Sequence, residues 1–113
     1  MNREQVKDFT RRISQCNRGG MIVVIYDIFF AYVTEAEDAF SRKENEQFQE
    51  SVRKAEKCID ELMRALDFKY AVSKDLYSLY VFAKESLAKS VMRNGLEDLN
   101  HAKMVMENLH DAF

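Results

Sequence analysis

The sequence predicts an all-α protein: an antiparallel up-down four-helix bundle with a short additional N-terminal helix. Three observations lead to this fold class. The 113 residues include no proline and only three glycines, whereas β-sandwiches and barrels need a turn residue roughly every ten positions. Apolar residues recur at helical spacing in four segments of about 20 residues each. Only short polar breaks separate these segments, so consecutive helices are expected to run antiparallel.

A chain of this length forms one domain, residues 1–113. Residues 1–18 hold five basic and two acidic side chains, and they carry a short apolar stripe of their own. The stripe consists of Val6, Phe9, Ile13 and Cys16. We expect an N-terminal helix here, which either completes the core or covers a binding surface until a partner displaces it.

The first long helix is expected over residues 20–42, after a turn at residues 17–20. From Ile22 to Val33 only Asp27 interrupts the apolar residues, so this helix is apolar nearly all round and requires burial on more than one side. Its core face is predicted to consist of Ile22, Ile25, Phe29, Val33, Ala36 and Phe40.

Three further helices are expected at residues 46–66, 74–93 and 96–112. Ser73 is predicted to be the N-cap of the second of these, and Asn94-Gly95 is predicted to end it. Tyr26 and Tyr80 are expected in the core, with their hydroxyl groups at its edge. The predicted core stripes are Phe48, Val52, Ala55, Ile59, Leu62 and Leu66; Leu76, Leu79, Tyr80, Ala83 and Leu87; and Leu99, Ala102, Val105, Met106 and Leu109.

Two helices carry more apolar surface than a four-helix bundle needs, which predicts a groove for a protein partner. The candidate contacts on the first long helix are Val23, Val24, Asp27, Phe30 and Ala31. Those on the third long helix are Tyr77, Val81, Ala88 and Met92, with Lys84 among them. Asp27 either binds the partner, by pairing with a lysine or arginine or by capping an N–H group, or forms a hydrogen bond within the bundle. Burial under the N-terminal segment and self-association into a homo-oligomer are the alternatives for this surplus surface.

Other functions find no support in the sequence. A net charge of −2 gives no reason to expect nucleic-acid binding, and an apolar run of 12 residues is shorter than the roughly 20 of a membrane span. Cys16 and Cys58 are expected to be reduced thiols in a cytoplasmic protein. His101 and His110 lie on one predicted helix, which does not match a di-iron bundle site. No catalytic residue, metal site or cofactor is predicted.

The order of several short motifs resembles the flagellar secretion chaperone FliS family. These motifs are the run from Met21 to Asp27, the segment from Ala55 to Asp67, the segment from Leu76 to Phe82, and Asn94-Gly95-Leu96 leading to a C-terminal Leu109–Phe113. The resemblance implies a non-enzymatic helical bundle that binds the disordered C-terminal segment of flagellin in hydrophobic grooves. It also implies that the protein prevents premature polymerisation and helps to present flagellin to the export gate. The alternative is a structural or oligomeric helical bundle with a partner other than flagellin.

Overall fold

The computed structural model of the chain describes residues 2–15 and 18–111. Cys16 and Asn17, where we expected the N-terminal stripe to end and a turn to begin, lie outside the described residues. The side chain of Ile13 lies outside them as well.

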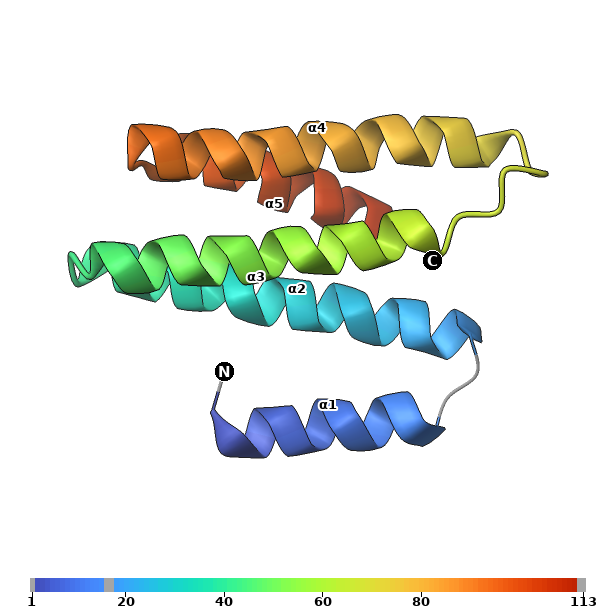
Figure 1. The fold of residues 1–113 in the computed structure, drawn as a ribbon, viewed down its shortest axis with the longest axis horizontal. Helices are drawn as coiled ribbons and strands as arrows, with labels where there is room; N and C mark the ends of the chain where they lie inside the picture. The colour runs from blue at the N-terminus through green and yellow to red at the C-terminus, as the bar shows by residue number, and fades with distance from the viewer. Residues whose placement is uncertain (1, 16–17, 112–113) are drawn as a thin grey trace.

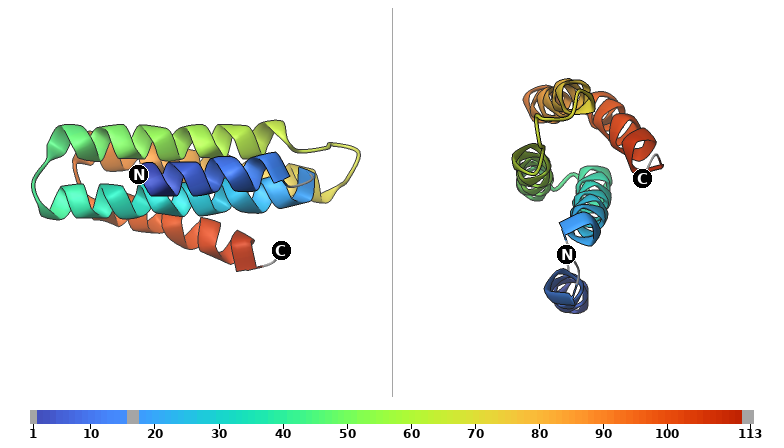
Figure 2. Two further views of the ribbon diagram at one scale, coloured as in Figure 1. Left: turned by 90° about the horizontal axis from the view of Figure 1, so that it is seen from below. Right: turned by 90° about the vertical axis from the view of Figure 1, so that its right-hand side faces the viewer.

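The described chain folds into five helices, and the last four form an antiparallel up-down bundle (Figure 1). Contacts between α2 and α3, α3 and α4, α4 and α5, and α2 and α5 close the bundle into a ring. Helix α1 runs antiparallel to α2 on the outside of this ring (Figure 2), and α2 is the only described helix that it contacts. The fold class predicted from the sequence is therefore confirmed. The helices are α1 (Arg3–Gln15), α2 (Arg18–Ser41), α3 (Asn45–Arg64), α4 (Val72–Arg93) and α5 (Leu96–Asp111).

The bundle core is built from one narrow apolar stripe on each of α2 to α5, as the spacing predicted. Its largest fully buried side chains include Tyr26, Phe29, Phe48, Leu87 and Leu99. The two buried tyrosines differ from our expectation, because their hydroxyl groups are not at the edge of the core. They form a hydrogen bond with each other across the bundle, with 2.8 Å between the two oxygens. This bond satisfies the two phenol groups that the packing removes from water.

Several local predictions are corrected by the structure. Arg18–Gly20 are the first residues of α2 rather than part of a turn. Ser73 is not the N-cap of α4: it lies inside the first turn, where its buried hydroxyl donates to the carbonyl oxygen of Asp67 at 2.6 Å. Leu79 was expected in the core but is 39% exposed. The predicted stop at Asn94-Gly95 is confirmed, because Asn94 ends α4 in the left-handed conformation with a φ of 49°.

The hydrogen bond between Tyr26 and Tyr80 can be tested by a double-mutant cycle. Tyr26→Phe removes the partner of the buried Tyr80 hydroxyl, so we expect it to lower the free energy of unfolding by about 1–2 kcal/mol. The double variant Tyr26→Phe/Tyr80→Phe should cost less than the sum of the two single variants, because no unpaired hydroxyl is left. Urea denaturation measures all four proteins, and strictly additive losses would contradict the pairing.

The same pair predicts an alkaline limit to stability. Burial raises the pKa of Tyr26 and of Tyr80 above the ordinary value of 10.0, since ionised phenolates are disfavoured away from water. The neutral phenols therefore stabilise the fold fully below about pH 10, and this contribution is lost as the pH rises above that value. Thermal unfolding between pH 8 and pH 11 should show a smaller loss in the double phenylalanine variant than in the wild type. An equal loss in both proteins would show that other groups set the limit.

Candidate functional site

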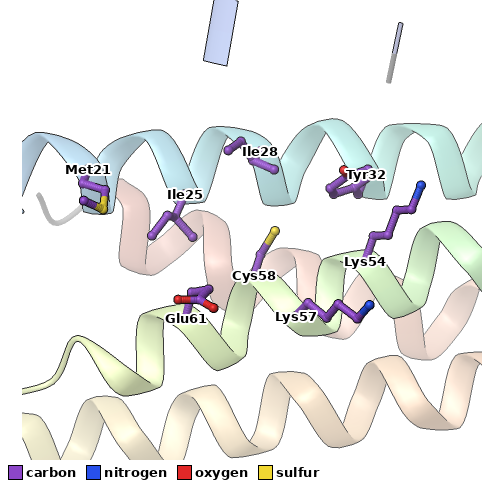
Figure 3. A pocket seen from close by; sticks show the side chains of 8 residues that line it. All are labelled: Met21, Ile25, Ile28, Tyr32, Lys54, Lys57, Cys58 and Glu61. Atoms are coloured by element: carbon purple, nitrogen blue, oxygen red, sulfur yellow. The ribbon is translucent and has the colours of Figure 1, made fainter. Parts of the chain in front are cut away.

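An apolar groove runs along the outside of the bundle between α2 and α3. Two adjoining hollows, each of about 380 Å³, share Met21, Ile25 and Glu61 in their linings and together form this α2–α3 groove. Figure 3 shows the hollow near Cys58, with side chains of α2 on one side and those of α3 on the other. The side chains that line the groove are Met21, Ile22, Ile25, Ile28, Tyr32, Lys54, Lys57, Cys58, Glu61, Arg64 and Ala65.

The groove exists because the two helices contribute unequal apolar surface. On α2, Met21, Ile25, Ile28 and Tyr32 follow one another at helical spacing and form a second apolar stripe beside the core stripe. On α3 the positions that face this second stripe carry long charged side chains, apart from Cys58. The charged groups stay at the rim in contact with water. Among the described side chains the α2 stripe is therefore only partly covered: Met21 is exposed, and Ile25, Ile28 and Tyr32 are half-buried.

Cys58 lies between the two helices in the hollow that Figure 3 shows, and its sulphur points toward α2. The side chain is buried and is not part of a disulfide. Burial, together with the nearby negative charge of Glu61, raises the pKa of the Cys58 thiol to about 12. The thiol is therefore protonated at neutral pH and behaves as a small apolar group in the groove.

The five α2 residues predicted to bind a partner do not line this groove. Val24 is buried, with 3% of its surface exposed, although it does not belong to the central core. It lies about 140–160° around α2 from the core residues Phe29 and Tyr26, and α1 is the helix that packs on α2 outside the bundle. We infer that α1 covers Val24. Val23 is exposed and Ala31 is half-buried.

Asp27 and Phe30 face the last turn of α5. The carboxylate of Asp27 lies 3.7 Å from Nε2 of His110, and the rings of Phe30 and His110 meet edge to face with centroids 5.7 Å apart. Phe30 and His110 also line a smaller hollow of about 310 Å³, whose other lining residues are charged. An interaction of Asp27 within the bundle, one of the two roles considered from the sequence, is therefore present in the structure.

The predicted α4 residues form a separate face. Tyr77, Ala88 and Met92 are exposed, Met92 most of all at 84%, and Val81 is half-buried. Lys84, in the same stripe, forms an ion pair with Asp60 of α3 at 2.6 Å. In the part of the chain that the structure describes, α2 and α4 lie diagonally across the bundle: their backbones stay apart, although the buried side chains of Tyr26 and Tyr80 meet in the core. The two predicted sets are therefore not brought together in one groove.

The sequence reasoning missed two features of this surface. Ile28 and Tyr32 were not identified, and Ile25 was assigned wholly to the core, although the spacing from Met21 to Tyr32 marks a continuous helix face. Several exposed apolar side chains at the α3–α4 connection and on α4 were also missed. They are Phe68, Tyr70, Val72, Leu79 and Phe82, and the ring of Phe68 lies against that of Tyr77.

Helix α2 is unusually apolar for a helix at the surface of a bundle. By length and composition, Gly19–Ser41 is long and apolar enough to cross a membrane, with a mean hydropathy of 1.5 in its most apolar window. Only 28% of that window is buried; most of its other apolar residues are half-buried, and Met21 and Val23 are exposed. Among residues 2–15 and 18–111, no three histidine, cysteine, aspartate or glutamate side chains form a group that could hold a metal ion.

An antiparallel bundle with an apolar groove beside its core is a protein-binding module, and it is suited to docking an amphipathic helix. The whole chain, residues 1–113, matches the family described as flagellar protein FliS. The chain therefore belongs to the FliS family, a family of flagellar export chaperones rather than enzymes. No curated protein is similar enough in sequence to count as a match.

The position of Cys58 predicts an unusual pH dependence of its alkylation. In a Cys16→Ser variant, Cys58 is the only cysteine, and its pKa of about 12 keeps the thiolate scarce at neutral pH. We expect its reaction with iodoacetamide to be far slower than that of free cysteine at pH 8, and to accelerate about tenfold for each pH unit up to pH 11. Mass spectrometry of timed samples measures the rate. A rate that levels off near pH 9 would mean that the thiol is not buried in the groove.

Proposed function

We propose that this protein is a cytoplasmic export chaperone that binds the disordered C-terminal segment of flagellin before secretion and prevents its premature polymerisation. The α2–α3 groove receives one helical stretch of that segment. Two observations support the proposal: membership of the FliS family, and an apolar stripe on α2 that the fold leaves only partly covered along the groove. The apolar stripe is the reason for choosing the α2–α3 groove as the binding site.

The energetics favour an extended contact. A disordered segment that folds on binding loses about 2–5 kcal/mol in ordering, and such complexes bury on the order of 1,000–3,000 Å². The α2–α3 groove holds only part of that area. The exposed α4 face around Tyr77, Ala88 and Met92 then serves as a second contact for the same client, and Val23 extends the contact area on α2. These assignments place the client around the outside of the bundle and leave its core intact.

Helix α1 is placed to take part in client binding, and its described side chains, those of residues 2–11, do not fill the groove. It packs on the outer side of α2, antiparallel to it (Figure 2). Among residues 2–11 only Phe9 is partly buried, so few side chains hold this part of the helix to the bundle. None of these residues lines the α2–α3 groove. A client that needs the covered face around Val24 displaces α1 at a low cost.

The proposal is tested with a fluorescent peptide that spans the C-terminal segment of flagellin, titrated with the full chain. We expect saturable 1:1 binding by fluorescence anisotropy. Met21→Asp places a charge in the groove, and we expect it to weaken binding at least tenfold, which corresponds to about 1.4 kcal/mol. Circular dichroism should show unchanged helicity, because Met21 is exposed and outside the core.

Matched variants separate the contact surfaces. Met104→Asp adds the same charge at an exposed methionine on α5, outside both proposed contact faces, and is expected to bind normally. Ala88→Asp tests the α4 face, where we expect a smaller loss than for Met21→Asp. Failure of the wild-type chain to bind any flagellin peptide would refute the function. Normal binding by Met21→Asp would refute the groove assignment. The assignment would also be refuted if light scattering showed that the protein forms a dimer without peptide and that Met21→Asp abolishes this dimer, because the groove would then be a self-interface.

A further inference from the structure

The two ends of the α2–α3 groove carry different charges. Lys54 and Lys57 line the end near Tyr32, and the ammonium nitrogen of Lys54 lies 5.7 Å from the centre of the Tyr32 ring. Glu50, which does not line the groove, pairs with Lys54 at 3.4 Å and offsets part of this positive charge. Glu35, half-buried one turn beyond Tyr32 on α2, is a second carboxylate near this end. The positive charge at the Tyr32 end therefore comes from the two lysines that line the groove and is partly offset by carboxylates outside the lining.

The opposite end of the groove is nearly neutral. Glu61 and Arg64 both line the hollow near Met21, and they form an ion pair with each other. The dipoles of the two groove helices do not change this pattern. Helices α2 and α3 run antiparallel (Figure 1), so the positive end of one lies beside the negative end of the other and their fields largely cancel. The lysine side chains therefore decide the electrostatic polarity of the groove.

The groove also sets the length of the helix that fits it. From Met21 to Tyr32 the apolar stripe of α2 extends about 16 Å, which corresponds to about three helical turns. A client helix of this length places apolar residues at positions i, i+3 or i+4, and i+7 against the stripe. Such a helix carries a partial negative charge at its C-terminal end, where its last carbonyl groups lack partners.

We propose that the groove binds its client helix in one direction, parallel to α2, with the C-terminal end of the client helix at Lys54 and Lys57. The inference rests on the proposed function, since it concerns the same groove. The two lysines interact favourably with the client's last carbonyl groups and with any carboxylate in its last turn. In the reverse orientation they face the partly positive N-terminal end of the client helix, which costs free energy instead.

The experiment uses the full chain and flagellin peptides. Overlapping peptides from the C-terminal segment identify the shortest stretch whose binding is weakened by Met21→Asp. That stretch is then made with a nitroxide spin label at its N-terminal or its C-terminal residue, and each version is added to ¹⁵N-labelled protein. We expect the C-terminal label to broaden amide signals around Lys54 and Tyr32, and the N-terminal label to broaden those around Met21 and Arg64.

A pair of charge variants provides an independent readout. Lys54→Glu/Lys57→Glu is expected to weaken binding of the same peptide about tenfold at low salt, and by less at high salt, because screening reduces the interaction. Lys43→Glu/Lys69→Glu changes the net charge by the same amount at exposed positions in the connections between helices, outside both proposed contact faces, and should have a much smaller effect.

The outcomes separate the inference from the function on which it rests. If each label broadens the signals expected for the other, the client helix binds in the opposite direction to the one proposed. If either label broadens both regions equally, the helix binds in both directions. Both results overturn the inference and leave the groove assignment in place. Equal weakening by the two charge variants would remove the role of Lys54 and Lys57. Absence of binding to the wild-type chain would instead refute the proposed function.

Discussion

The structure depends on one imbalance: α2 is apolar around most of its circumference, while each helix that packs against it offers a single narrow apolar stripe. The stripe that contains Phe29 and Val33 is fully buried in the core. The rest of the apolar surface of α2 has to be covered in another way, because about 25 cal/mol is lost for each Å² of apolar area left in water. The arrangement of the neighbouring helices follows from how this surplus is shared.

Three neighbours cover the surplus to different degrees. On the outer side, α1 packs on α2, and Val24 is buried there. Beside α5, His110 contacts the rings of Tyr26 and Phe30 and pairs with Asp27. Beside α3 the coverage is incomplete, because charged side chains stand where apolar partners would be needed. A binding groove thus arises where the apolar surfaces of two packed helices fail to match in width.

Side-chain size and charge on α3 shape this groove as much as the apolar residues on α2 do. Cys58 is short, so it leaves room between the helices, while Lys54 and Lys57 keep their ammonium groups in water at the rim. The same residues therefore supply both the space for a client helix and the charge that distinguishes its two ends.

The sequence by itself determined the helical class, the number of long helices and most of the core, because helical periodicity records which face of each helix avoids water. It also showed that α2 has excess apolar surface. It did not determine which side of α2 remains open, since α1, α3 and α5 compete for that surface and only their packing assigns each stripe a neighbour. For the same reason Leu79 looked like a core residue: its place in the α4 stripe is regular, but no neighbouring helix covers it. Tertiary packing likewise decided that the Tyr26 and Tyr80 hydroxyls meet, because residues 54 positions apart approach each other only when α2 and α4 face across the bundle.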